Sequence, residues 1–213
     1  MTGVLRKATL LATAGLLAAS AAMAGVPSAG NSTTPSLIPL VGNAGGVPDG
    51  FGTVSITVRD LANNPLVGAS VVIDLSLATD LALCDDQLDA NALVNCVAKT
   101  TRKFTDVLGQ VSFVVLGGSN GPGNATSNVN NGRIYANGTL IGSPTVAAYD
   151  LDGTNGVAGN DLSAWLTDFA ANPTVYGRSD YDDSGAVAGN DLSFWLTRFA
   201  SAASTASCTT SCL

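Results

Sequence analysis

The feature that most constrains this chain is a stretch near its C-terminus that occurs twice. Residues 150–170 read DLDGTNGVAGNDLSAWLTDFA, and residues 180–200 read DYDDSGAVAGNDLSFWLTRFA, so the copies are offset by 30 residues without a gap. Each copy begins with oxygen-bearing side chains at alternate positions and ends in an apolar stripe. This order predicts, twice, a calcium-type loop that leads into a helix.

The spacing of a calcium loop assigns a role to each position. A loop of the EF-hand type uses side-chain oxygens at positions 1, 3 and 5, a backbone carbonyl at position 7 and a carboxylate at position 12. The predicted ligands are therefore Asp150, Asp152, Thr154, Gly156 and Asp161 in the first copy, and Asp180, Asp182, Ser184, Ala186 and Asp191 in the second. This predicts two bound calcium ions. The alternative is that these residues only mark turns and that the loops bind nothing.

The backbone of each loop and the helix that follows it are also predicted. Position 6, occupied by Asn155 and Gly185, needs a residue that tolerates positive φ. Val157 and Val187 at position 8 are expected to pair across the two loops. Each helix should carry an apolar stripe, and the two stripes should face each other in a small core; the stripe residues are Leu162, Trp165, Leu166 and Phe169, then Leu192, Trp195, Leu196 and Phe199.

No helix is expected before either loop, because Pro144–Ala148 reads as extended and Asn172-Pro173 breaks the chain. A loop with an exiting helix, present twice without an entering helix, resembles the dockerin domain over residues 149–200. The resemblance implies two F-hand repeats, each a calcium loop followed by one helix, that bind two calcium ions. It also implies docking on a cohesin-like protein partner. Dockerins attach secreted carbohydrate-active enzymes or surface proteins to larger assemblies, such as polysaccharide-degrading ones. The partner would be selected at loop positions 10 and 11, which are Gly159 and Asn160, and Gly189 and Asn190.

Two departures from the family pattern bear on affinity and partner. Position 9 is Ala158 or Ala188, where the family often has Asn or Asp, and position 5 is Thr154 or Ser184. Fewer charged ligands predict weak calcium binding, with Kd on the order of 10⁻⁴ to 10⁻³ M, as in extracellular modules. The Gly-Asn pairs differ from an ordinary cohesin-docking code. A second interpretation is thus a structural surface subunit in which calcium only stabilises the C-terminal module.

Composition argues against several other classes of function. The chain has sixteen acidic residues, all Asp, and no His, and its net charge of -7 disfavours a nucleic-acid partner. Eight of the Asp lie between residues 150 and 191, so the acidity is local. No nucleophile elbow, phosphate loop or Cys/His pair is present, so we expect no catalytic residues and no enzyme activity. A carbohydrate-active enzyme or a sugar-binding accessory protein is the least favoured alternative.

The N-terminus and the cysteines predict export. Residues 1–24 have a basic start, an apolar run and a small-x-small site at Ala22-Met23-Ala24, which together predict a cleaved secretory signal peptide. The alternative is a non-cleaved anchor. The mature chain should contain no membrane span and should be secreted or displayed on a bacterial cell surface. In an exported protein the four cysteines favour disulfides. Cys84 and Cys96 could close one short loop and Cys208 and Cys212 another, with other pairings left open.

The middle of the chain has the period of β-strands. Val54, Ile56 and Val58 alternate with polar residues. Residues of the same period share one face in two further segments, namely Val71, Ile73, Leu75 and Leu77, then Val111, Phe113 and Val115. Asn137-Gly138 predicts a hairpin, and residues 145–148 a last strand. Residues 78–104 and 117–132 read as irregular. The segments RDLANNPLVGASVVI and TDVLGQVSFVV resemble bacterial Ig-like surface domains, in which such modules act as spacers, stalks or adhesion modules.

The predicted plan is a mainly β chain with an Ig-like antiparallel β-sandwich followed by a small α module. Its parts are a signal peptide (1–24), a linker or edge strand (25–50), the sandwich (51–148), the paired calcium-loop module (149–201) and a Cys-containing tail (202–213). The function expected of this plan is that of a secreted, non-catalytic binding or assembly protein.

Overall fold

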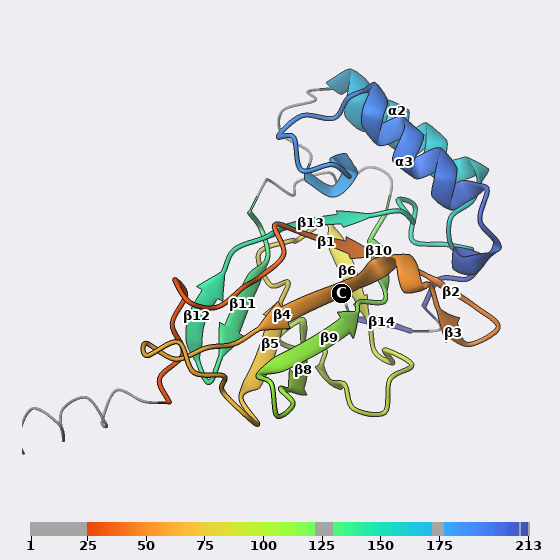
Figure 1. Cartoon of the computed structure of the whole chain (residues 1–213). Helices are drawn as coiled ribbons and strands as arrows, with labels where there is room; N and C mark the ends of the chain where they lie inside the picture. Colours follow the sequence, from red (N-terminus) through yellow and green to blue (C-terminus); the bar gives the residue numbers. More distant parts are fainter. Residues whose placement is uncertain (1–24, 122–129, 172–176, 209, 213) are drawn as a thin grey trace, which may run out of the picture.

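The chain folds into a mainly β structure, consistent with a β-sandwich, that carries two helices on one side (Figure 1). The computed structural model describes residues 25–121, 130–171, 177–208 and 210–212. The predicted signal peptide, residues 1–24, lies outside the described residues. No helix in the described part of the chain is long and apolar enough to cross a membrane.

The largest sheet contains the predicted hairpin. Its strand order is β12-β11-β5-β8-β7, with bounds Thr139–Gly142, Arg133–Ala136, Ser70–Asp74, Thr100–Phe104 and Leu93–Asn95. Asn137 and Gly138 connect β11 to β12 with φ of 46° and 82°, the positive values that a tight hairpin of this kind requires. Val71 and Ile73 are buried, as predicted, but β5 ends at Asp74, and Leu77 beyond it is 53% exposed.

Smaller sheets complete the β region. β4 pairs antiparallel with β9, and Val54, Ile56, Val111 and Phe113 point into the core, as their alternation predicted. A three-stranded sheet has the order β10-β6-β14. The bounds are Thr53–Thr57 for β4, Gln110–Val114 for β9, Gly117–Ser119 for β10, Leu81–Cys84 for β6 and Ser211–Cys212 for β14. The strands β6, β7, β8 and β10 lie in segments for which no strand was predicted.

The N-terminal segment adds a buried strand that departs from the antiparallel prediction. β1 (Leu37–Leu40) pairs in parallel with β13 (Thr145–Ala148), and Ile38 and Leu40 are fully buried. The hairpin β2 (Asn43–Ala44) with β3 (Val47–Pro48) and the short 3-10 helix η1 (Gly50–Gly52) follow it. β13 leads directly into the first predicted calcium loop, so this parallel pair supports the start of that loop.

The two helices share one hydrophobic core with the strands. α2 (Gly159–Ala171) and α3 (Gly189–Phe199) each follow one loop, with the 3-10 helix η2 (Gly177–Ser179) before the second loop. Trp165 and Trp195 are buried in the same cluster as Ile56, Ile73 and other strand residues. The predicted boundary between residues 148 and 149 therefore falls inside a continuous core.

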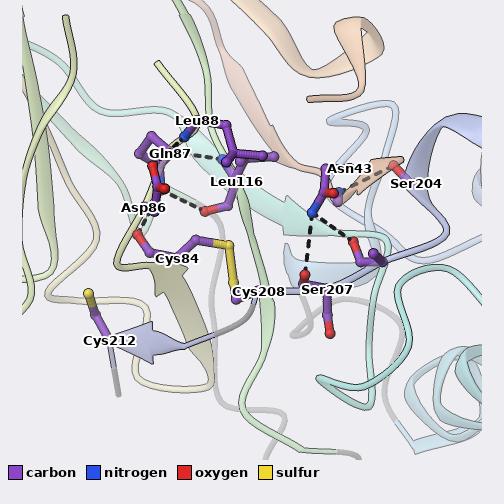
Figure 2. The surroundings of a disulfide bond; sticks show 12 residues. Asn43, Cys84, Asp86, Gln87, Leu88, Leu116, Ser204, Ser207, Cys208 and Cys212 are labelled. Carbon is purple, nitrogen blue, oxygen red and sulfur yellow. Dashed lines mark hydrogen bonds between the residues drawn. A yellow bond between two sulfur atoms is a disulfide. The ribbon is translucent and has the colours of Figure 1, made fainter. Parts of the chain in front are cut away.

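The disulfides join distant parts of the chain, unlike the two short loops suggested by the spacing. Cys84 bonds to Cys208 and Cys96 to Cys212, across 124 and 116 residues. The reason is the path of the chain after the 3-10 helix η3 (Ala202–Ser204). β14 pairs with β6 and brings the last two cysteines beside Cys84 and Cys96. Figure 2 shows the Cys84–Cys208 bond. Two disulfides indicate an oxidising or extracellular environment.

Candidate metal centre

The first predicted loop brings its three carboxylates together. Asp150 lies two residues after the end of β13, Asp152 lies two residues further on, and Asp161 lies in the first turn of α2. One oxygen of each lies within 4.8 Å of the others, and Asp150 and Asp161 are buried. This cluster of three carboxylates could hold a metal ion.

The second loop repeats the arrangement 30 residues later. Asp180 follows η2, and Asp191 lies in the first turn of α3, with Asp182 between them in the loop. The three carboxylates again lie within 4.8 Å of one another, and Asp180 and Asp191 are buried. Two sites of the same construction therefore lie at the starts of the two helices.

The carboxylate at position 12 also closes each loop. Asp161 accepts hydrogen bonds from the backbone N–H groups of Leu151 (2.6 Å), Asp152 (2.9 Å) and Ala158 (2.7 Å). In the second copy, the Asp191 carboxylate accepts the equivalent hydrogen bonds from the backbone N–H groups of Tyr181, Asp182 and Ala188. Because one side chain collects three donors, it holds the loop in its curved form and aligns the start of the helix.

The predicted left-handed residues are confirmed. Asn155 has a φ of 61° and Gly185 a φ of 84°, so position 6 takes positive φ in both copies. Position 4 does the same, with Gly153 at 75° and Asp183 at 57°. Asn, Asp and Gly are the residues that adopt this conformation most readily, which explains their frequency in the loops.

Burial of the carboxylates makes their charges costly. It raises the pKa of Asp150 to about 8, with the nearby charge of Asp161 adding to the effect. Burial likewise raises the pKa of Asp161, Asp180 and Asp191. A cation placed among them would offset this cost, because an opposite charge favours the ionised form.

The remaining predicted ligands lie in the loops with the carboxylates. The Thr154 hydroxyl donates to Asp152 (2.8 Å), and the Ser184 hydroxyl donates to the carbonyl of Ala186 (3.1 Å). Gly156 is buried. The roles of Thr154, Gly156, Ser184 and Ala186 as ligands stay predictions.

The predicted partner-binding residues lie at the starts of the helices. Gly159 and Asn160 begin α2, Gly189 and Asn190 begin α3, and all four are exposed. The exposed position would allow contact with a partner, and that role stays a prediction.

The apolar stripes of the helices are only half buried, which corrects the prediction of a closed core between them. Trp165 and Trp195 are 2% and 1% exposed, whereas four stripe residues are 45–49% exposed, namely Leu166, Phe169, Leu196 and Phe199. Each tryptophan instead packs toward the strands, and its ring stacks on the Phe four residues later, at centroid distances of 5.4 and 5.2 Å. An apolar rim on both helices is left in contact with solvent.

The pairing of Val157 with Val187 was also predicted incorrectly. Both side chains are buried, but the Val157 N–H donates to the carbonyl of Ser204 at 2.8 Å. The segment after α3 therefore takes the place that a partner loop occupies in the expected arrangement.

An important contact that sequence reasoning missed is a buried ion pair. Asp168 of α2 accepts two hydrogen bonds of 2.7 Å from the guanidinium of Arg178, which is fully buried. Arg178 also donates to the Ser119 hydroxyl of β10 at 3.0 Å. One signal was available in the sequence, since position 168 is Asp where the second copy has Arg198.

A second missed contact joins the two loops. The rings of Tyr149 and Tyr181 stack at 4.4 Å with an interplanar angle of 7°, and the Tyr181 hydroxyl donates to the carbonyl of Ala148 (2.9 Å). Trp195 donates through Nε1 to the carbonyl of Tyr149 (3.2 Å). The second repeat thus holds the backbone that carries Asp150.

The fold and the site together define a mainly β, disulfide-bonded protein with two acidic clusters, each of which could hold a metal ion. Comparison of the chain with family models, curated proteins and solved structures finds no match.

Proposed function

We propose that this chain is a secreted, non-catalytic binding or assembly protein whose C-terminal module binds two calcium ions and docks on a protein partner. The observation that carries the proposal is the repetition of the same three-carboxylate cluster at both loops. A single acidic cluster is common on protein surfaces. Here two clusters occupy equivalent positions of a repeat, and each has two of its three carboxylates buried, which favours a shared role in binding an ion.

The donor set favours calcium over other metals. The clusters offer only oxygen atoms, the chain has no His, and all four cysteines are in disulfides. Zinc prefers nitrogen and sulfur ligands, whereas calcium takes many oxygens in flexible geometry. When bound, calcium would supply the positive charge that offsets the buried carboxylates. Asp161 and Asp191, already held by backbone N–H groups, would keep one ligand of each site in place.

A role in docking is supported by the surface of the helices. Leu166, Phe169, Leu196 and Phe199 are about half exposed on the same two helices whose first turns carry the exposed Gly-Asn pairs. A dockerin-like module would use such a surface to contact a cohesin-like partner. The β region, proposed as an Ig-like sandwich, would carry the module outside the cell.

The second candidate is a structural surface subunit in which calcium only stabilises the module. One observation favours it: the module shares its hydrophobic core with the strands, and four of the clustered carboxylates, Asp150, Asp161, Asp180 and Asp191, are buried. A partner would then be unnecessary for the role of calcium.

Calcium titration of chelator-treated protein tests the metal assignment. We expect two ions per chain by calorimetry and a rise in melting temperature. Asp150→Asn and Asp180→Asn should each remove one ion. The matched control is Asp183→Asn, which removes a charge from the second loop at position 4, outside the cluster, and keeps a residue that tolerates positive φ. Absence of any calcium-dependent stabilisation in the wild type would refute the proposal.

A pull-down from the secreted fraction separates the two candidates. A calcium-dependent partner that is lost with Leu166→Ser and Leu196→Ser, and kept with the exposed Thr167→Ser as control, supports docking. A melting shift without such a partner supports the structural candidate.

A further inference from the structure

The two proposed metal loops differ in what covers them. The first loop lies against the described part of the C-terminal tail, defined as residues 201–208 and 210–212. Val157 donates its backbone N–H to Ser204, and Gly156 lies so close to the tail that an added Cβ would meet the carbonyl of Ser204 and lie 2.6 Å from the backbone nitrogen of Ala206. Position 7 of the first loop is therefore glycine because the tail leaves no space for a side chain.

The tail is fixed to the β region at several points. Cys208 is bonded to Cys84 at the end of β6. Asn43 and Ala206 exchange backbone hydrogen bonds of 3.0 and 2.9 Å, and the Ser204 hydroxyl donates to Asp49 at 2.8 Å. Figure 2 shows Asn43 beside this segment and Cys84 bonded to Cys208.

The other side of the first loop lies against β10. The Ser119 N–H donates to the carbonyl of Asp150 at 2.7 Å, and a Cβ added to Gly153 would lie 2.5 Å from the Ser119 carbonyl. A small cavity of about 40 Å³ lies between the loop, β10 and the tail, and both Asp150 and Cys208 line it. A predicted ligand and the disulfide thus border the same space.

The second loop carries side chains at the two positions where the first loop has these glycines. Position 7 is Ala186 and position 4 is Asp183, so both carry a side chain where the first loop has glycine. At position 6 of the second loop, a Cβ added to Gly185 would meet nothing within 4 Å. The differences between the copies at positions 4 and 7 therefore follow from the cover over the first loop.

We propose that the C-terminal tail is a disulfide-locked clamp that makes the first metal site exchange its ion slowly while the second exchanges freely. This inference rests on the calcium binding proposed above. Residues 204–206 lie against Gly156 and Val157 and would hinder the opening of the loop that releases its ion, and the Cys84–Cys208 bond opposes movement of these residues. A dithiol reductant would open the clamp: it gives two electrons and two protons to the disulfide, which becomes two thiols, and is itself oxidised to a disulfide.

Release of calcium into a fluorescent chelator, followed by stopped-flow on the full chain, tests the clamp. We expect two phases of equal amplitude. Asp150→Asn should remove the slow phase, and Asp180→Asn the fast phase. Gly156→Ala should accelerate the slow phase by at least about tenfold, which corresponds to roughly 1.4 kcal/mol. Its control is Gly185→Ala, which places alanine at a similar positive φ without a steric contact and should leave the slow phase unchanged.

The disulfide is tested in the same assay. Cys84→Ser with Cys208→Ser should accelerate the slow phase, whereas Cys96→Ser with Cys212→Ser should not. If Gly156→Ala or the first Cys variant does not fold, dithiol treatment of the second Cys variant, in which only Cys84–Cys208 remains, gives the same comparison. A single release phase for both ions, a slow phase that belongs to the second loop, or a slow phase insensitive to every clamp change would overturn the inference. If the wild type releases no calcium, the proposed function fails as well.

Discussion

Asp168 and Arg198 occupy the same position in the two repeats, yet they carry opposite charges and are paired with different partners. Asp168 binds Arg178, which reaches Ser119 of β10, whereas Arg198 binds Asp49 before η1 at 3.0 Å. The loops and the tryptophans follow the repeat, but the last turns of the helices do not. Each helix is thereby fixed to a different part of the β region.

Replacing Arg178 by Met should strongly destabilise the fold. The side chain is fully buried, so the change leaves the Asp168 carboxylate in the interior without its cation. Breaking one side of a buried pair costs about 3–5 kcal/mol. The exposed Arg102 is the matched control, and Arg102→Met should change the free energy of unfolding by less than about 1 kcal/mol. Urea unfolding measures both, and equal losses would contradict the prediction.

The two tryptophans should respond differently to the same substitution. Trp195 donates to the Tyr149 carbonyl, whereas the buried Nε1 of Trp165 has no hydrogen-bond partner among the described residues. Trp195→Phe should therefore cost about 1 kcal/mol more than Trp165→Phe, the usual worth of one hydrogen bond. Denaturant unfolding in excess chelator compares them free of metal. A larger loss for Trp165→Phe would show that packing outweighs the hydrogen bond.

Asp161 should matter for folding even without metal. Its carboxylate accepts three backbone N–H groups, so Asp161→Ala leaves three donors without their acceptor. We expect a loss of at least about 2 kcal/mol in the free energy of unfolding, measured in chelator. Asp152→Ala, at a half-exposed side chain in the same loop, should cost less than about 1 kcal/mol under these conditions. Equal losses would mean that Asp161 has no separate structural role.

Asp60 should contribute to acid unfolding. Its pKa is held below the ordinary 3.8 mainly by the hydrogen bond from the Asn64 backbone, with further bonds from Gly25 and Ala62. Because the folded pKa is lower than the unfolded one, this stabilisation is present above the unfolded value and is lost as pH falls through the folded value. Asp60→Asn should have a lower melting temperature than wild type at neutral pH, and the difference should shrink as the pH falls below about 4, the ordinary pKa of the carboxyl group. Melting curves with a constant offset would contradict this.

Local patterns predicted the parts of the structure that depend on neighbouring residues. The three carboxylates of each loop, the left-handed Asn155 and Gly185 and the hairpin at Asn137-Gly138 all follow from short-range spacing. β6 was missed because LALC is buried on both sides and has no alternation, and β8 because its sequence is mostly polar.

Contacts between distant residues were not predictable in the same way. The pairing of Cys84 with Cys208 depends on β14 reaching β6, and the parallel pair of β1 with β13 joins residues more than a hundred positions apart. Which residues of each helix stripe are exposed depends on where the strands pack against the helix. The 3.6-residue period identifies the apolar stripe but carries no information on the position of the strands.

The crossed disulfides also determine how the chain would carry a mechanical load. All of both repeats lies between the cysteine pair at 84 and 96 and the pair at 208 and 212. Tension applied at Cys212 would therefore pass through a covalent bond to Cys96, between β7 and β8, instead of along α3 and the loops. The acidic clusters lie off the line of force, so a protein pulled from this end would keep its metal loops folded while the β-sheet carries the strain.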